Sequence, residues 1–331
     1  MGAAMNLLTA SVGSYPRIGD GHEQQAVRRA MRLWEAGKIH VGDLEEAHQQ
    51  AARWAIEEQE AAGIEVVTDG LVRWYDHYSH IAGRLAGCKV DGLVRFADTN
   101  YYVREAVVEG EIGWSGSILR REYEFAAGVA NRPVKMVVTG PHTIAHHSIN
   151  EGGVYADRAE LAIAYAKALA LEVADLVDAG CRHIQIDEPL IHQHPGWLEI
   201  AAEALALLAA GKGEATLALC LYFGDAVPVY SALQELPVDD LYLDFTYSPA
   251  LPDLIASQGS DKRLGLGLID GRNTRLERAE EMLPILEKIA ARLDEAILAP
   301  SCGLEYLPRD RARRKLERLV EIRDAFAGVG S

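Results

Sequence analysis

Short apolar runs that end in polar residues recur along this chain and alternate with stretches of helical periodicity. The eight runs cover residues 7–12, 64–67, 134–138, 183–186, 216–219, 241–243, 264–269 and 296–299. Helical patterns are expected twice within 23–63 and then at 157–179, 197–210, 230–235, 251–257, 276–293 and 309–326. Such alternation predicts a parallel α/β sheet, and eight repeats favour a TIM (β/α)8 barrel. We expect one barrel domain over residues 1–331, although composition alone fits two smaller domains equally well.

Residues 71–131 interrupt this alternation. The stretch is polar and aromatic without a clean period, and it contains Trp74, Tyr75, His77, Tyr78 and His80. It is too long for a simple loop, so we predict that helices and a hairpin are inserted after the second strand. The aromatic cluster is expected either to line the pocket or to pack the insertion against the barrel.

Composition and charge exclude several classes of function. The formal net charge of -16 opposes binding to nucleic acid or to an anionic membrane. The four cysteines, at positions 88, 181, 220 and 302, do not form the closely spaced pattern of a secreted disulfide scaffold. The N-terminus lacks the regions of a signal peptide, and no run of about 18 apolar residues occurs. We therefore expect a soluble cytoplasmic protein.

Polar residues follow the predicted strands, at the barrel face where TIM-barrel chemistry occurs. They are Ser14, Asp69, Thr139, Asp187, Glu188, Cys220, Asp244, Asp270 and Cys302. Two thiolates after strands five and eight, with a carboxylate after strand six, could meet a zinc ion. Helix capping explains some of the Ser, Thr and Asp residues equally well, and free cysteines are commonly buried and inert.

Five segments resemble one known family. Ser301-Cys302-Gly303-Leu304 at the end of a strand is similar to the Asp-Cys-Gly-Leu segment of cobalamin-independent methionine synthases. The others are Val12-Gly13-Ser14-Tyr15-Pro16, Val138-Thr139-Gly140-Pro141, Ile184-Gln185-Ile186-Asp187-Glu188-Pro189 and Gly267-Leu268-Ile269-Asp270. The chain therefore looks like the C-terminal catalytic barrel of that family, or a short stand-alone relative.

The resemblance implies methyl transfer to a zinc-bound thiol. It implies zinc ligation by Cys220, Asp244 and Cys302, and it assigns catalytic positions to Asp187, Asp270 and Arg272. Substrate-binding positions are implied at Ser14, Asp69, Thr139, Asp187 and Glu188. A thiol that enters the open zinc position is deprotonated and becomes a nucleophile.

Five departures from the family pattern qualify these expectations. A histidine ligand of the family is replaced by Ala218, a glutamate ligand by the shorter Asp244, and a substrate-binding glutamate by Leu71. The tryptophan that stacks on a pterin corresponds to about His147, which argues against a folate donor. The acid histidine after strand seven is replaced by Arg272, which stays charged and can bind a carboxylate but cannot donate a proton.

We predict a zinc-dependent methyltransferase that acts on homocysteine or another small thiol. The departures favour a non-folate donor such as methylcobalamin or a methylated corrinoid protein. A carbon-sulfur lyase or thiol alkyltransferase on the same barrel is the first alternative. The second is a metal-free barrel that binds a corrinoid or tetrapyrrole without turnover.

Overall fold

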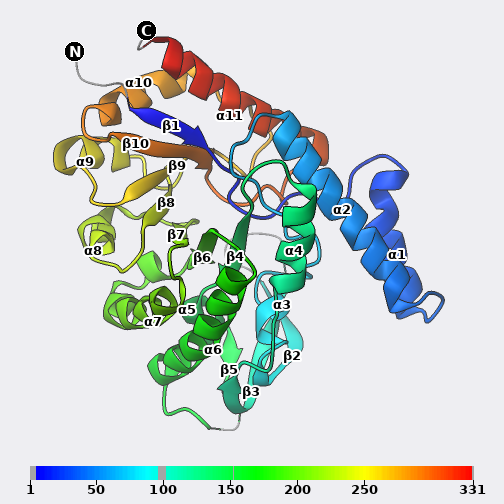
Figure 1. The fold of residues 1–331 in the computed structure, drawn as a ribbon. Coiled ribbons are helices and arrows are strands. Elements are labelled where there is room, and N and C mark those ends of the chain that lie inside the picture. Colours follow the sequence, from blue (N-terminus) through cyan, green and yellow to red (C-terminus); the bar gives the residue numbers. More distant parts are fainter. Residues whose placement is uncertain (1–4, 96–101, 152, 330–331) are drawn as a thin grey trace.

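The computed structural model describes residues 5–95, 102–151 and 153–329, and a parallel sheet is its central element. Seven strands are hydrogen-bonded in the order β1-β10-β9-β8-β7-β6-β4 (Figure 1). They are β1 (Asn6–Thr9), β4 (Lys135–Thr139), β6 (His183–Asp187), β7 (Thr216–Leu221), β8 (Asp240–Asp244), β9 (Arg263–Ile269) and β10 (Glu295–Pro300). Seven of the eight predicted strands therefore lie where the apolar runs placed them.

The remaining predicted strand, residues 64–67, is the second in chain order. It is not a regular strand, yet it closes the sheet into a barrel. Val66 forms an isolated parallel bridge to the end of β1, and Val67 forms one to the residue before β4. A longer ladder with β1 does not form, because the Glu65 carboxylate accepts the backbone N–H of Thr9 at 2.8 Å. That N–H is one of the donors that a parallel ladder would use.

A side chain of the neighbouring helix pairs with Thr68, the residue that follows this segment. The amide of Gln59, which is fully buried, accepts from the backbone N–H of Thr68 at 3.0 Å. The same amide donates to the Thr68 carbonyl oxygen at 2.9 Å. Gln59 therefore pairs with the backbone as a neighbouring strand would, and it leaves no buried peptide group of Thr68 unsatisfied.

Helices surround the barrel close to the predicted positions. They are α1 (Ala26–Glu35), α2 (Val41–Ala61), α5 (Pro141–His146), α6 (Arg158–Asp178), α7 (Leu198–Gly211), α8 (Tyr230–Gln234), α9 (Leu251–Gln258), α10 (Ala279–Ala290) and α11 (Arg309–Val329). Short 3-10 helices lie at Glu23–Gln25, Ile191–Gln193, Pro195–Trp197 and Val227–Val229. α6 begins where the side chain of Asp157 accepts the N–H of Glu160 at 2.9 Å, a typical N-cap.

The predicted insertion contains helices and a hairpin. β2 (Ala86–Arg95) and β3 (Tyr102–Gly113) pair antiparallel, and β5 (Ser148–Ile149) joins β3 in parallel. α3 (Ser79–Ala82) precedes the hairpin, and α4 (Arg120–Val129) leads back to the barrel at β4. In Figure 1 this small sheet lies below the barrel, beside α6.

Buried side chains form two separate groups, as expected when strands are covered on both sides. The larger group lies between the strands and the surrounding helices and includes Leu161, Leu205 and Leu316. The smaller group contains the side chains Ala10, Val12, Tyr78, Val103, Ala218, Cys220, Tyr222, Tyr242, Ile297, Ala299 and Cys302. The predicted thiols thus belong to the smaller group, among tyrosines and small residues.

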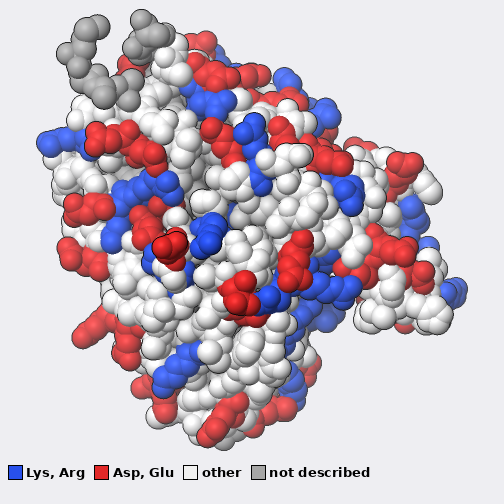
Figure 2. Space-filling model, in the orientation of Figure 1, with Lys and Arg blue, Asp and Glu red and all other residues white. Residues whose placement is uncertain are grey.

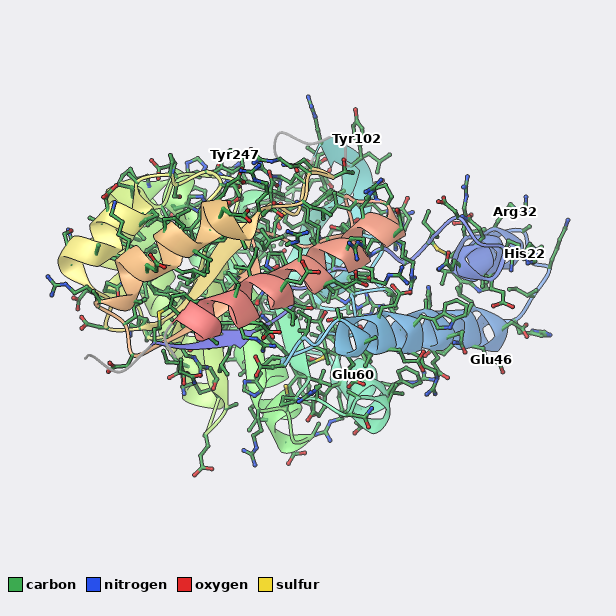
Figure 3. All side chains as sticks on the ribbon, turned by 90° about the horizontal axis from the view of Figure 1, so that it is seen from above. His22, Arg32, Glu46, Glu60, Tyr102 and Tyr247 are labelled. Carbon is green, nitrogen blue, oxygen red and sulfur yellow. The ribbon has the colours of Figure 1, made fainter. Side chains whose placement is uncertain are left out.

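α1 and the first half of α2 extend away from the barrel (Figures 1 and 3). Figure 3 shows His22 and Arg32 on this extension, with Glu46 beside them and Glu60 at the barrel end of α2. Basic and acidic side chains are interspersed over the face shown in Figure 2. Among the helices that the structure describes, none combines the length and apolar character needed to span a membrane.

A buried ion pair fixes α11 to the loop after β9, and its removal should destabilise the fold. Lys315 is fully buried and bonds Glu277 at 2.7 Å, and the same carboxylate accepts the N–H of Asp270 at 3.0 Å. Lys315→Met should lower the free energy of unfolding by about 3 kcal/mol, because an unpaired carboxylate stays buried.

Urea denaturation measures this loss. Lys288→Met is the matched control, because the Lys288–Asp253 pair is largely exposed and should change stability by less than about 1 kcal/mol. Equal effects of the two substitutions would contradict the assigned role of the buried pair.

Candidate active site

Cys302 lies on the loop after β10, directly against the loop after β1. The N–H of Leu304 donates to the carbonyl oxygen of Ser14 at 2.8 Å. A Cβ atom at Gly303 would lie 2.0 Å from Ser14 Oγ, so glycine is required for this close approach. Ser14 Oγ is buried and has no hydrogen-bond partner among residues 5–95, 102–151 and 153–329. Ser14 thus offers a hydroxyl group beside the Cys302 loop, and its substrate-binding role stays a prediction.

The two predicted thiols share one electrostatic environment. Cys220, the second-last residue of β7, and Cys302 are both free and buried. Burial raises the pKa of Cys220 well above its ordinary value, and the nearby Asp187, Cys302 and Asp244 raise it further. Burial and Asp244 likewise raise the pKa of Cys302. Both side chains are therefore neutral thiols unless a cation or base takes the proton.

The donor atoms of the predicted zinc site suit zinc, but they do not converge. In the part of the chain that the structure describes, no three His, Cys, Asp or Glu side chains form a group that could hold a metal. Asp244 Oδ1 accepts the N–H of Thr246 at 2.9 Å, and its Oδ2 accepts that of Phe223 at 3.2 Å. Ala218 occupies the position of the fourth zinc ligand, which is a histidine in the family pattern. Ligation by Asp244 would require these hydrogen bonds to be exchanged, so the metal site stays a prediction.

Asp187 lies at the end of β6, next to Cys220 in the sheet. Its Oδ1 accepts from the side chain of Gln185 at 2.6 Å, and its Oδ2 accepts from the Tyr222 hydroxyl at 3.3 Å. Burial raises the pKa of Asp187 to about 6, against the effect of these donors. Asp187 is therefore a buried carboxyl group that can hold or release a proton near neutral pH.

Glu188 caps the start of α5. Its Oε1 accepts the N–H of His142, and its Oε2 accepts the N–H of Thr143, both at 2.9 Å. The Thr143 hydroxyl adds a third bond at 2.7 Å. These contacts satisfy the first amides of a helix, so they assign Glu188 to α5. Its predicted substrate role has no contact in support.

Asp69 lies behind a strained turn. Its Oδ1 accepts the N–H of Leu71 at 3.0 Å, and Leu71 has a φ of 51°, which is unusual for a leucine. Asp69 Oδ2 has no hydrogen-bond partner in the described ranges. Burial raises the pKa of Asp69 to about 7, and the carboxylate of Glu122 contributes.

Asp270 and Arg272 form a bridge at the rim of the barrel. Asp270 Oδ1 accepts from the backbone N–H and from Nε of Arg272, at 2.9 and 3.2 Å. The guanidinium lies over the ring of Tyr247, 4.2 Å from its centroid, and donates to Thr246 Oγ1 at 3.0 Å. Tyr247 and Tyr102 project from the same edge of the molecule (Figure 3), which places the start of β3 on this side.

The aromatic cluster of the insertion divides into two parts, one that packs against α4 and one that contacts the Cys302 loop. Trp74 stacks on His80 with ring centroids 4.7 Å apart, and both bond Glu122 on α4, which is packing. His77 instead bonds Glu305 on the Cys302 loop at 2.6 Å. The hydroxyl group of Thr139 donates to the carbonyl oxygen of His77, so this predicted substrate residue holds the histidine loop.

Glu188→Gln tests whether this residue is a structural cap. The amide group would present N–H donors to an N–H of α5, so the free energy of unfolding should fall by about 2 kcal/mol. Thermal or urea denaturation measures the change, with the exposed Glu203→Gln on α7 as the control. Unchanged stability combined with lost thiol binding would restore the substrate-binding role.

Comparisons with known proteins agree with this arrangement. Residues 7–325 match the family described as cobalamin-independent synthase, catalytic domain. A methionine synthase of Sulfurisphaera tokodaii is 35% identical over 322 residues, which cover 95% of this chain and 91% of the relative. One of Saccharolobus islandicus is 36% identical over 321 residues, with 95% and 93% covered.

Solved structures show the same fold. A B12-independent methionine synthase from Shewanella superposes with a TM-score of 0.79 at 22% identity, and 98% of each chain is covered. A protein described as a putative vitamin-B12 independent methionine synthase, from Listeria monocytogenes, has a TM-score of 0.74 at 19% identity, with 98% and 99% covered. Together with the family match, these findings show that the chain belongs to the cobalamin-independent methionine synthase family and is a methyltransferase of that family.

Proposed function

We propose that this chain transfers a methyl group to the sulfur of homocysteine or a similar small thiol at the barrel mouth. The observation that carries the proposal is the position of two buried free thiols, Cys220 and Cys302, among Ser14, Asp187 and Asp244 at the ends of parallel strands. Methyl transfer is the activity of the family, which favours it over the lyase and corrinoid-binding alternatives.

The chain's own residues have distinct parts in this proposal. Ser14 Oγ, a buried hydroxyl without a partner in the described chain, binds a polar group of the acceptor. Asp187 lies between the Gln185 amide and the Tyr222 hydroxyl and binds a second polar group of the acceptor. The apolar surroundings of Cys220 and Cys302 exclude water, which strengthens electrostatic interactions at the reacting sulfur.

We propose Cys220, Cys302 and Asp244 as the ligands of one zinc ion. Two thiolates and a carboxylate are ligands that zinc accepts, and three protein ligands leave a position for the substrate. Bound zinc would lower the pKa of an incoming thiol. The fit is chemical rather than geometric, because Asp244 has to give up its bonds to Thr246 and Phe223.

The methyl donor is proposed to be a reduced methylfolate rather than a corrinoid. The family is cobalamin-independent, which conflicts with the corrinoid donor and corrinoid-protein partner expected from the sequence. His147, at the position of the family's stacking tryptophan, packs against Tyr78 with ring centroids 4.4 Å apart. An aromatic surface is therefore retained at this position.

Elemental analysis tests the metal. Wild-type protein should contain about one zinc ion per chain, and Cys220→Ser and Cys302→Ser should lose most of it. Cys181→Ser is the matched control, because Cys181 is buried just before β6, at the opposite end of that strand from Asp187. Wild-type protein without zinc after growth in added metal would refute the ligand set.

A methyl-transfer assay tests the reaction. Wild-type protein should form methionine from homocysteine and methyltetrahydrofolate, and Cys302→Ser should be slower by at least about 100-fold, because the reacting sulfur is no longer activated. Mass spectrometry of the methylated thiol measures the product. Transfer from methylcobalamin alone would refute the proposed donor, and no transfer from either donor would refute the function.

A further inference from the structure

The proposed reaction requires a proton carrier, and the sequence does not supply the usual one. Transfer from a donor CH3–X to a thiol R–SH forms a sulfur–carbon bond and breaks the C–X bond. One proton has to move from sulfur to X, so atoms and charge balance without any further reactant. Arg272, which replaces the family's acid histidine, stays charged and cannot carry that proton. The following inference rests on the proposed function and identifies another carrier.

The structure brings together a histidine and a glutamate that are far apart in the sequence. His77 Nε2 lies 2.6 Å from Glu305 Oε1, and the two residues come from the insertion and from the Cys302 loop. The carbonyl oxygen of His77 accepts a hydrogen bond from Thr139 at the end of β4. The ring centroids of Trp74 and His77 lie 6.2 Å apart in an edge-to-face arrangement. The barrel and the insertion thus both hold His77.

Glu305 connects this pair to a cavity. A cavity of about 520 Å³ lies beside the Cys302 loop, and Tyr15, Arg17, Leu71, Glu305 and Tyr306 are among the residues that line it. Leu71 and Tyr15 follow directly from the segments that carry Asp69 and Ser14. A ligand in this cavity therefore lies within reach of the Glu305 carboxylate and beside the loops that surround the thiols.

The surrounding charges favour one proton on the pair. Burial opposes a charge on His77, but Glu305, Asp187 and Asp76 act together to raise the pKa of the imidazole. Burial also opposes a charge on Glu305, and His77 and Arg17, with a hydrogen bond from Tyr306, lower the pKa of that carboxyl. These charges favour the imidazolium–carboxylate form of the pair, and Asp187, the neighbour of Cys220 in the sheet, is one of the groups that favour it.

We propose that His77 and Glu305 form the acid–base pair that delivers the proton to the leaving atom of the methyl donor. Glu305 takes the Nε2 proton of His77 and passes it to X as the C–X bond breaks. The proton given up by the acceptor thiol restores the imidazolium. The net change is the loss of S–H and the gain of X–H.

The pH dependence of methyl transfer tests the pair. Activity should fall as pH rises through the raised pKa of His77, because the proton is then absent. In Glu305→Gln the group that passes the proton to X is lost, so kcat should fall. The carboxylate that raises the pKa of His77 is lost as well, so the alkaline limb of the remaining activity should move to lower pH. His77→Gln keeps a donor near the Nε2 position but cannot titrate. The pH–rate profile of this variant should lack the alkaline limb, and its kcat should be lower by about 100-fold.

A second His–Glu pair provides the matched control. His80 and Glu122 bond at 2.9 Å, are more deeply buried than His77 and Glu305, and do not line the cavity, so His80→Gln should keep the alkaline limb. If His77→Gln and Glu305→Gln both showed wild-type rates and an unchanged alkaline limb, the acid–base role of the pair would be refuted and the proposed function would stand. Absence of transfer in the wild type would overturn both. If Glu305→Gln does not fold, the alkaline limb of His77→Gln decides alone.

Discussion

Two hydrogen bonds between the Gln59 amide and the backbone of Thr68 are the interaction on which the barrel mouth depends. Segment 64–67 closes the sheet through isolated bridges and backbone hydrogen bonds to the ends of β1 and β4. The Gln59 amide of α2 fixes Thr68, the residue that follows. Asp69 and Leu71 follow immediately, and the position of their loop decides where the cavity wall lies. Because a buried amide without its partner costs more than an ordinary hydrogen bond returns, this single side chain has a large effect on the site.

Three carboxyl groups buried at the mouth illustrate how one environment gives different roles. Burial raises the pKa of Asp69, Asp187 and Glu188 alike. Glu188 accepts from two backbone amides and one hydroxyl group of α5, whereas Asp187 accepts from two side chains. Asp69 has one oxygen without a partner in the described structure. The number of fixed donors, rather than burial, therefore separates a structural carboxylate from one that can meet a ligand.

The architecture, and the strand ends that carry the candidate site residues, could be predicted from sequence, because both follow from local patterns. Seven strands and the helices from α6 to α11 lie where periodicity placed them. The loss of regular pairing at 64–67 could not be foreseen, since it depends on Glu65 reaching Thr9 across 56 positions. The His77–Glu305 pair was missed for the same reason, as 228 positions separate its members. Asp244 was identified, but no sequence pattern could show that backbone amides occupy its oxygens.

The left-handed backbone of Leu71 puts strain into the wall of the cavity. Such a conformation costs a non-glycine residue about 1–3 kcal/mol. Burial of the leucine side chain returns about 1.5–3 kcal/mol, and the side chain is only 5% exposed. Because the two quantities are similar, burial of the side chain offsets the strain of the backbone. A ligand that displaced the leucine side chain would remove this compensation, so occupancy of the cavity and the shape of its wall are thermodynamically linked.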